Sequence, residues 1–471
     1  MAHKPIRFGT SGWRGIMADD FTFARVRAAA AGVADYVRSR NRKRPALVVG
    51  YDTRFLSDEF ARTTVEVLGA HRVGSWLCGR PTPTPTIAHE IIRRRADGGI
   101  NFTASHNPAE YNGLKFSTPD GAPALPEATK KIERFAEKHL RGTAKKPPRG
   151  PAPPVEEIDP VPAYLETLAE KVDVGELKKA GLKIGYDPLY GAGAGVLDRF
   201  LEQHGVEAHS LHTHRDVLFG GHPPEPSDEI LSGLRKLVAE RGCGVGISTD
   251  GDADRYGVLD AYGKFISPNH ILALLVDYLL ETRPDWPRGV ARSVATTHLV
   301  DAVARHYRAR LYETPVGFKY IGELIKQDKI AIGGEESAGL SIYGHVPEKD
   351  GILACLLVAE MVARRGATLG EQLESLFRKV GAYYPVRVNL HMSESARAGV
   401  VERIKKDPKS FGGRAVASVN RMDGLKLLFD DDAWVLMRLS GTEPVVRCYV
   451  ETHSERDNAA LVEAAKRFVG D

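Results

Sequence analysis

The stretch VGISTDGDADR (Val245–Arg255) decides the fold class, because it joins an apolar, strand-like run to a loop of closely spaced carboxylates. The same order of apolar run, Gly- or Asp-bearing loop and helical pattern recurs along the chain. Strands that alternate with helices are typical of α/β domains with sheets rich in parallel strands, whose ligand loops lie at the carboxyl ends of the strands. The other instances are ALVVGYDTR (Ala46–Arg54), LKIGYDPLYGAG (Leu182–Gly193) and IAIGGEESAG (Ile330–Gly339).

The length of 471 residues exceeds what one hydrophobic core serves and favours three or four domains. The proline-rich segment Arg141–Pro162 predicts a linker without regular structure, and the end of a first domain near residue 150. A second boundary is expected just after DGDADRYG. A third is expected within Gly381–Leu390, before a last piece that closes with the helical pattern Ser454–Gly470. The predicted domains are residues 1–150, 151–256, 257–378 and 379–471.

Composition excludes several classes of protein. The chain is 42% hydrophobic and 27% charged, and it contains no apolar run of about eighteen residues, so we expect no contact with a membrane. The N-terminus shows no apolar secretory segment. The cysteines form no CxxC pair, which argues against zinc sites and disulfides and favours a reducing, cytoplasmic location. The net charge of +4 suits a small anionic substrate, and the basic run Arg38–Pro45 is interpreted as a solvated helix end rather than a nucleic-acid surface.

The loop DGDADR carries the strongest local signal. Its aspartates, Asp250, Asp252 and Asp254, lie at i, i+2 and i+4, a spacing that puts three carboxylates on one side of an extended loop. An EF-hand is excluded, because its sixth position is Arg255 instead of Gly and its twelfth is Ala261 instead of Glu. Three carboxylates completed by water or substrate resemble a catalytic Mg²⁺ site, and the alternative is a solvated acidic turn.

Two further loops could bind a phosphosugar. RLSGTEPVVRCYVE (Arg438–Glu451) is interpreted either as an anion cradle or as a plain hairpin, because glycine lets the backbone approach an anion and arginines fork onto phosphate oxygens. GGEESAG (Gly333–Gly339) offers carboxylates that accept hydrogen bonds from sugar hydroxyls, or else it is an acidic helix start.

Two loops nearer the N-terminus complete the set. GTSGWRG (Gly9–Gly15) is a glycine-rich turn around Arg14, either flexible or anion-binding. TASHNPAEYNGLKF (Thr103–Phe116) presents Ser105 on a stiff turn, as a surface turn or as a nucleophile. The chain has no P-loop, GxGxxG, HExxH or GxSxG motif, which excludes NTPases, dinucleotide oxidoreductases, zincins and α/β-hydrolases as first choices.

The ordered set GTSGWRG, TASHNP, DGDADR, TPVGFKYI, GGEESAG and RLSGTEP resembles the α-D-phosphohexomutases, the phosphoglucomutase and phosphomannomutase superfamily, over essentially the whole chain. The resemblance implies an α/β protein with four domains around a central cleft. Three of them are related α/β domains with mixed sheets, and the fourth is a smaller C-terminal α+β domain that binds phosphate. It also implies a phosphosugar substrate, Mg²⁺ and glucose 1,6-bisphosphate as activator and intermediate, in a monomer or homodimer that binds no nucleic acid.

The resemblance further implies roles for single residues. Ser105 would be the phosphoserine, and it would hold Mg²⁺ together with the three aspartates. Arg14 and Lys115 would be cationic helpers near it, and His345 and Lys349 would lie near the reacting hydroxyl. Substrate-binding roles are implied for Arg255, Thr314, Gly317, Lys319, Glu335, Ser337, Arg438, Ser440, Gly441, Thr442 and Arg447.

The preferred sugar follows from the same resemblance. GEES is similar to the glucose-type loop, whereas mannose-type members tend to have GEMS and glucosamine-type members GEQS. We therefore expect interconversion of glucose 1-phosphate and glucose 6-phosphate, with mannose phosphates as possible second substrates. The alternatives are a phosphomannomutase or phosphoglucosamine mutase, a Mg²⁺-dependent sugar phosphatase, and a non-catalytic phosphosugar-binding protein.

Overall fold

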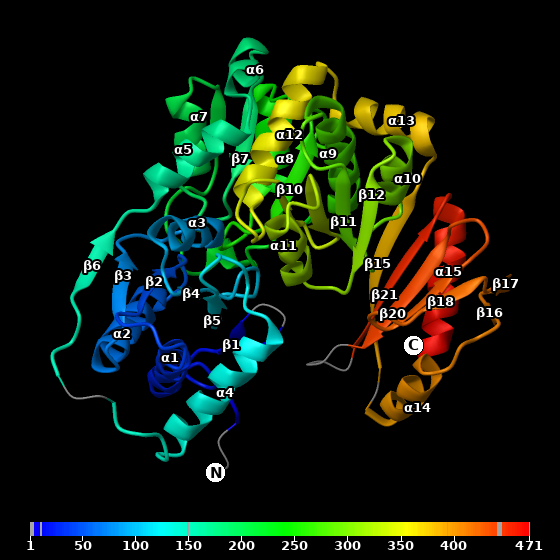
Figure 1. Cartoon of the computed structure of the whole chain (residues 1–471). Coiled ribbons are helices and arrows are strands. Elements are labelled where there is room, and N and C mark those ends of the chain that lie inside the picture. Colours follow the sequence, from blue (N-terminus) through cyan, green and yellow to red (C-terminus); the bar gives the residue numbers. More distant parts are fainter. Residues whose placement is uncertain (1–3, 10–11, 148–149, 393, 440–444, 471) are drawn as a thin grey trace. The chain divides into compact units, whose positions relative to one another are not determined.

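A computed structural model describes residues 4–9, 12–147, 150–392, 394–439 and 445–470 of the chain. The chain divides into two compact units. The first comprises residues 1–268, 317–328 and 337–369, and the second comprises residues 269–316, 329–336 and 370–471. Figure 1 shows the elements in chain order. Among the described residues, no helix has the length and apolar character that a membrane span requires.

A six-stranded mixed sheet, in the order β1-β5-β4-β2-β3-β6, begins the first unit. β2 pairs in parallel with β3 and β4, whereas β5 is antiparallel to β4 and β1. Leu47 and Val49 of β2 face a core shared with α1, α2 and α4, and Val48 faces α3 on the other side of the sheet. The strands are β1 Trp13–Ile16, β2 Ala46–Tyr51, β3 Gly74–Cys78, β4 Gly99–Phe102, β5 Tyr111–Ser117 and β6 Val155–Ile158; the helices are α1 Phe23–Arg38, α2 Ser57–Ala70, α3 Thr84–Arg94 and α4 Pro126–Leu140.

The proline-rich segment is not free of regular structure, so that expectation is wrong. Within it, Val155–Ile158 forms β6, which pairs in parallel with β3 at the edge of the first sheet. An edge strand tolerates neighbouring prolines, because one of its sides donates no hydrogen bond to the sheet. The first sheet therefore extends past residue 150. α1 does end at Arg38, where the basic run begins, as expected.

A second mixed sheet, in the order β10-β9-β7-β8, follows in the first unit. β9 is parallel to β7 and antiparallel to β10, so the DGDADR loop, residues 250–255, connects two neighbouring strands of the sheet. Leu234 and Val238 of α8 pack on this sheet with Leu259 of β10. The elements are α5 Val161–Lys171, α6 Val174–Lys179, β7 Ile184–Asp187, α7 Leu197–Gln203, β8 Ala208–Ser210, the 3₁₀ turn η1 Phe219–Gly221, α8 Ser232–Arg241, β9 Val245–Thr249 and β10 Tyr256–Asp260.

Three later elements also belong to the first unit: α11 Phe318–Lys326, β14 Gly339–Ile342 and α12 Gly351–Arg365. Asp350 starts α12 by accepting a hydrogen bond from the Leu353 amide at 2.8 Å, and Gly366 ends it in the left-handed conformation. Residues 352–362 of α12 are buried, and Cys355 Sγ lies 3.5 Å from the Ser248 carbonyl oxygen of β9. α12 therefore anchors the segment just before it, which includes Lys349, to the second sheet.

The second unit contains a parallel sheet in which β11 pairs with β12 on one side and β13 on the other. Its elements are α9 Pro268–Thr282, β11 Gly289–Ser293, α10 Leu299–His306, β12 Arg310–Thr314, β13 Ile332–Glu335 and α13 Leu369–Val380.

An antiparallel five-stranded sheet, in the order β15-β21-β20-β19-β18, ends the chain. One face packs against α14 and α15, and the other packs Trp434, Leu436 and Tyr449 against Val294 and Ala295 of the second unit. Ser454 caps α15, as its sequence pattern predicts. The elements are β15 Tyr384–His391, α14 Glu394–Ile404, β16 Ser410–Phe411, β17 Arg414–Ala415, β18 Ser418–Asn420, β19 Leu425–Leu428, β20 Trp434–Leu439, β21 Val445–Thr452 and α15 Glu455–Val469.

A network of buried and half-buried charges lies inside the second unit, and we call it the Lys426 network. Arg292 donates to Asp301 Oδ1 at 2.5 Å, to Asp301 Oδ2 at 2.6 Å and to Glu313 Oε1 at 2.7 Å. Lys426 Nζ lies 3.0 Å from His298 Nε2 and 3.4 Å from Glu313 Oε1. The network links β11, α10 and β12 to the C-terminal sheet. It comprises Arg292, His298, Asp301, Glu313, Lys426 and Glu451.

The cysteines are free thiols. All four, Cys78, Cys243, Cys355 and Cys448, are buried and form no disulfide.

Candidate active site

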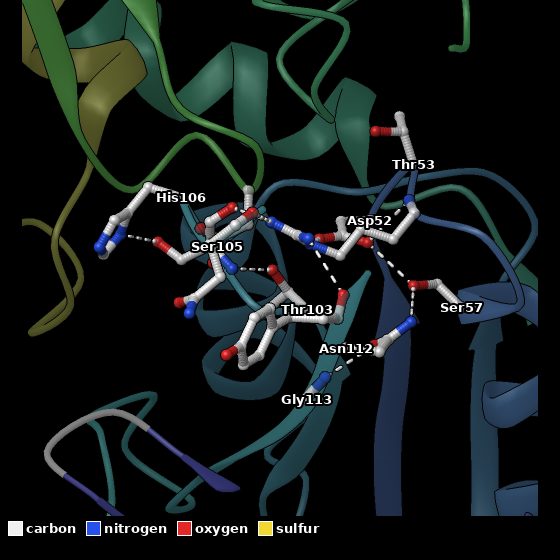
Figure 2. A network of polar contacts seen from close by, with 12 residues as sticks. Asp52, Thr53, Ser57, Thr103, Ser105, His106, Asn112 and Gly113 are labelled. Carbon is white, nitrogen blue, oxygen red and sulfur yellow. Dashed lines mark hydrogen bonds and ion pairs between the residues drawn. The ribbon is translucent and has the colours of Figure 1, made fainter. Parts of the chain in front are cut away.

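Ser105 lies on the loop that follows β4 and is 1% exposed. Its φ of +54° is left-handed, a conformation that costs a non-glycine residue about 1–3 kcal/mol and persists only when its surroundings impose it. The Ser105 amide donates to Thr103 Oγ1 at 2.8 Å, and the Ser105 hydroxyl lies 3.4 Å from His106 Nδ1 (Figure 2). The stiff turn that the sequence predicts therefore presents one hydroxyl in a defined direction.

The hydroxyl of Ser105 donates to Asp250 Oδ2 at 2.6 Å, which joins the serine loop to the DGDADR loop. The aspartates Asp250, Asp252 and Asp254 are buried, and each offers an oxygen within 4.8 Å of the others. Gly251 makes this approach possible, because a Cβ at this position would lie 2.5 Å from the Ser105 carbonyl oxygen. The two loops thus meet backbone to backbone, although 145 residues separate their functional groups.

The acidic triad has the donor set of a hard cation site. Asp252 Oδ1 and Asp254 Oδ1 are buried without a hydrogen-bond partner, a costly state for carboxylate oxygens unless a ligand completes it. Burial, reinforced by the neighbouring charges of Asp252 and Asp254, raises the pKa of Asp250 well above its ordinary value. A divalent cation that takes oxygen ligands would relieve both penalties. The triad and Ser105 therefore fit Mg²⁺.

Two lysines lie directly against the triad. Lys115 of β5 places Nζ 2.5 Å from Asp252 Oδ2 and 2.7 Å from Asp254 Oδ2. Lys349 places Nζ 2.8 Å from Asp254 Oδ2 and 3.0 Å from Glu348 Oε1. Burial alone would lower the pKa of each lysine, but the surrounding carboxylates outweigh burial and raise it. Both side chains are therefore ammonium ions at neutral pH.

Two arginines add positive charge around the serine. Arg14 of β1 donates from Nη1 to Asn107 Oδ1 at 2.5 Å, and Arg255 Nε lies 3.8 Å from Asp254 Oδ1. The charge of Arg255, followed by burial, lowers the pKa of His106 well below its ordinary value, so this imidazole is neutral. The two lysines and Arg255 contact the triad, and Arg14 contacts the loop of Ser105, so cations gather at the site where a phosphoryl group would need them.

His106, Asn107 and Thr84 belong to this site but were not among the predicted site residues. His106 and Asn107 stand beside Ser105 in the TASHNP stretch, so adjacency to the nucleophile was the available signal. The Thr84 hydroxyl donates to Asp252 Oδ2. Thr84 starts α3, and no local pattern connects it with a loop 168 residues further along the chain.

His345 has contacts of a different kind. Its side chain is fully buried, and Nε2 lies 2.7 Å from Asp350 Oδ2, which also accepts from the Tyr164 hydroxyl at 2.7 Å. These contacts tie the ring to the residue that caps α12. A role for His345 at the reacting hydroxyl stays a prediction.

Other predicted residues of the first unit lie on turns or helix starts. Gly317 precedes α11 with a φ of +127°, Lys319 lies in the first turn of that helix, and Ser337 lies in the turn before β14.

The remaining predicted residues belong to the second unit. Thr314 ends β12 and Glu335 ends β13, both buried. Arg438 of β20 faces Arg447 of β21 in register and donates to Asp423 Oδ2 at 2.9 Å. Two arginines opposite each other on neighbouring strands suit an anion, since like charges repel without one. Ser440, Gly441 and Thr442 lie outside the described residues.

Comparison with known proteins decides the family. Residues 5–141, 162–263 and 267–380 match the phosphoglucomutase/phosphomannomutase α/β/α domains I, II and III, and residues 388–467 match the C-terminal domain of the same family. A curated phosphoglucomutase/phosphomannomutase of Thermococcus kodakarensis is 32% identical over 97% of this chain and 96% of that protein. The chain belongs to the phosphoglucomutase/phosphomannomutase family.

Two further relatives of this phosphohexomutase carry different sugar names. A probable phosphoglucosamine mutase of Methanothermobacter thermautotrophicus is 29% identical and covers 99% of this chain and 98% of its own. The crystal structure of a putative phosphomannomutase from Thermus thermophilus superimposes with a TM-score of 0.86 at 33% identity, over 100% of both chains. The expected superfamily is confirmed, as is the fold class of three α/β domains with mixed sheets and a C-terminal antiparallel domain. The exact domain bounds stay predictions.

Proposed function

We propose that this phosphohexomutase interconverts glucose 1-phosphate and glucose 6-phosphate through a phosphoserine at Ser105 and a glucose 1,6-bisphosphate intermediate. One observation carries the proposal: Ser105 Oγ lies 2.6 Å from Asp250 Oδ2 of a buried triad. A serine with this contact, surrounded by cations, is arranged for phosphoryl transfer rather than for a structural turn.

The triad and Ser105 would hold Mg²⁺. Bound there, the ion would supply charge neutralisation for the transferred phosphoryl group. Lys115 and Lys349 hold the carboxylates of Asp252 and Asp254 in place and add fixed positive charge beside the reacting oxygen. Arg14 and Arg255 would contact phosphate oxygens, as guanidinium groups do.

In the transfer, the P–Oγ bond of phosphorylated Ser105 breaks and a P–O bond to the free sugar hydroxyl forms. Overall, the proton of that hydroxyl passes to Ser105 Oγ, the oxygen that leaves phosphorus. Lys115 is the predicted acid–base candidate, and as an ammonium ion it can donate a proton to the leaving oxygen. His345 and Lys349 are predicted to lie near the reacting hydroxyl. The bisphosphate then returns its other phosphate to Ser105. A phosphatase would instead transfer the phosphoryl group from Ser105 to water and release inorganic phosphate, whereas a mutase excludes water from this step.

Recognition of the sugar is assigned to Glu335, Ser337, Thr314, Gly317 and Lys319, whose polar atoms suit sugar hydroxyls and phosphate. Arg438 and Arg447, with Ser440, Gly441 and Thr442, would bind whichever phosphate is distal from Ser105.

Glucose is favoured by Glu336, the third residue of GEES and the position at which the mannose- and glucosamine-type loops differ. Its carboxylate lies 3.6 Å from Arg387 Nη1. The names of the relatives keep glucosamine phosphate as the alternative substrate. A single side chain in a hydroxyl-reading site shifts preference by about 1–3 kcal/mol.

The decisive experiment is a coupled assay on glucose 1-phosphate, mannose 1-phosphate and glucosamine 1-phosphate, each with Mg²⁺ and a trace of its 1,6-bisphosphate. Inorganic phosphate is followed in parallel. We expect fastest isomerisation of glucose 1-phosphate without phosphate release. Faster turnover of glucosamine 1-phosphate would transfer the assignment to that sugar, and phosphate release without isomerisation would replace the mutase by a phosphatase.

A pair of serine variants assigns the activity to the site. Ser105→Ala should abolish isomerisation of every sugar. Ser341→Ala is the matched control, because Ser341 is equally buried and its hydroxyl donates to the Val346 carbonyl oxygen at 2.7 Å, apart from the triad. Full activity in Ser105→Ala would remove this serine from the mechanism.

A further inference from the structure

Arg54 is a fully buried arginine whose guanidinium group uses all five of its N–H donors. Nε donates to Asp52 Oδ2 at 3.2 Å. The other four donors reach main-chain carbonyl oxygens of one turn, those of Ser105 at 2.6 Å, Asn107 at 2.6 Å, Pro108 at 2.8 Å and Tyr111 at 3.1 Å. One side chain thus binds four main-chain carbonyl oxygens of the segment that carries Ser105.

Asp52, the residue that follows β2, holds Arg54 in place. Asp52 Oδ1 accepts hydrogen bonds from the Arg54 amide at 3.0 Å and from Ser57 Oγ at 2.9 Å. Since Oδ2 accepts from Arg54 Nε, the carboxylate binds both the main chain and the guanidinium of Arg54. The chain of contacts continues from Ser57 to Asn112 at 3.0 Å, and from Asn112 to the Gly113 amide at 2.8 Å (Figure 2). The guanidinium therefore rests on the sheet itself and has little freedom to move.

The segment between β8 and α8 contacts Arg54 and its neighbour Thr53. Arg215 donates to the Thr53 and Arg54 carbonyl oxygens, both at 3.1 Å. The Phe219 ring centroid lies 5.0 Å from the Arg54 guanidinium carbon. These contacts seal the arginine from water, so it cannot touch a substrate. Sealing also strengthens its hydrogen bonds, because competing solvent is absent.

Ser105 needs such support. Its left-handed φ of +54° is unfavourable for a serine, and its carbonyl oxygen accepts a bond from Arg54. We infer that Arg54 is the positioning residue of this enzyme: its planar fork holds the Ser105 turn in the strained conformation that aims Oγ at Asp250. The inference rests on the proposed function of Ser105 and goes beyond it, because Arg54 acts only through the turn.

The geometry of the fork makes lysine a poor substitute. A guanidinium presents five donors in one plane, whereas an ammonium has three donors around a single atom and cannot reach four carbonyl oxygens at once. With the turn relaxed, Oγ would leave the in-line position, and a displacement of about 1 Å can cost roughly 100-fold in rate. We expect the loss in kcat, because the substrate contacts do not involve Arg54.

The test compares Arg54→Lys with Arg292→Lys. Arg292 is the matched control, because it is also buried and donates from all three guanidinium nitrogens, but to Asp301, Glu313 and the Ser293 carbonyl oxygen in the other unit. We expect kcat to fall by about 100-fold in Arg54→Lys with KM changed by less than about threefold, whereas Arg292→Lys keeps a kcat within about twofold of wild type.

Hydrogen exchange supplies a readout that does not depend on catalysis. In Arg54→Lys, the amides of residues 103–112 should exchange faster, while those of the remaining first unit keep their wild-type rates. Equal loss of kcat in both variants, or unchanged exchange of the turn, would overturn the inference. Should Arg54→Lys not fold, Asp52→Asn serves instead, with an expected fall in kcat of about tenfold, and a wild-type kcat would again overturn it.

Phosphorylation of Ser105 separates failure of the inference from failure of the proposed function. Wild-type protein is incubated with glucose 1,6-bisphosphate and Mg²⁺, and the phosphate on Ser105 is measured by mass spectrometry. Absence of phosphate in wild type would overturn the proposed function and the role of Arg54 with it. Rapid phosphorylation of wild type and of Arg54→Lys alike would overturn the role of Arg54 alone.

Discussion

The acidic triad and the Lys426 network are both buried clusters of charge, but they differ in how their polar atoms are satisfied. In the Lys426 network, Arg292 saturates the Asp301 carboxylate, and Glu451 accepts from Thr297, the His298 amide and Trp434 Nε1. In the triad, Asp252 and Asp254 each retain a buried oxygen without a hydrogen-bond partner. A saturated cluster serves the fold, whereas an unsatisfied one is kept for a ligand.

The largest expected effect is a loss of turnover when one carboxylate of the triad is replaced. Asp252→Asn removes a charge and a proposed Mg²⁺ ligand from the triad, so turnover should fall by roughly 1,000-fold or more, because a catalytic metal typically supplies several kcal/mol. The melting temperature without divalent cation should hardly change, since mutual repulsion of the carboxylates also falls. Turnover and melting curves with and without Mg²⁺ test this. Retention of more than a tenth of wild-type turnover would contradict it.

In the Lys426 network, we expect the opposite result, a loss of stability with little change in turnover. Arg292→Met leaves the Asp301 carboxylate buried without its bidentate partner, and breaking such a pair costs about 3–5 kcal/mol. The kcat of the folded fraction should stay close to wild type. Urea unfolding combined with turnover measures both quantities. A variant that unfolds like wild type would show that the network contributes little to stability.

The third prediction concerns how the free energy of unfolding depends on pH through Lys426. Burial, followed by the charge of Arg292, lowers the pKa of Lys426 to about 7, whereas an unfolded lysine titrates near 10.4. Between about pH 7 and 10, the unfolded chain binds a proton here that the folded chain does not, so the free energy of unfolding rises with pH. Relative to Lys426→Met, wild type should gain on the order of a few kcal/mol across this window.

Thermal unfolding of wild type and Lys426→Met at several pH values measures this difference. Groups that titrate alike in both proteins cancel from this difference. A difference that stays constant from pH 7 to 10 would show that Lys426 keeps its charge in the folded protein.

The smallest effect is expected at the rim of the Lys426 network. Arg305 and Asp432 form an ion pair at 3.4 Å, and their side chains are 61% and 59% exposed. Solvent screens such pairs, so a double-mutant cycle with Arg305→Ala and Asp432→Ala should give a coupling energy below about 1 kcal/mol. A coupling of several kcal/mol would show that the network extends to the surface.

The sequence alone predicts the chemistry of the site better than its assembly. Asp250, Asp252 and Asp254 lie within one loop, so their joint role follows from their spacing. The contact between Ser105 and Asp250 spans 145 residues, and only resemblance to the family indicated it. Arg54 was missed because its main-chain partners begin 51 residues later, at Ser105. Within YDTR, nothing distinguishes it from an arginine on the surface.

One prediction was wrong for a local reason, and one contact was not indicated by the sequence. The prolines around Val155–Ile158 led to the wrong prediction of a segment without regular structure. The composition of the segment does not reveal that it pairs with β3 at the open edge of the first sheet. The family resemblance places His345 near the reacting hydroxyl, and that role stays a prediction. The contact that the sequence did not indicate is with Asp350, five residues further on, at the start of α12. Helix capping competes for the same residue types as catalysis, and sequence spacing does not separate the two roles.

The buried cysteines make the protein convenient for labelling. Burial raises the pKa of Cys78 and of Cys448 to about 12, and it also raises that of Cys243 and Cys355. Thiolates, not thiols, react with maleimides, so the native cysteines should stay unmodified. One cysteine introduced at an exposed position on each unit would then carry a donor and an acceptor dye. Energy transfer between them would follow the distance between the two units as a sugar phosphate binds.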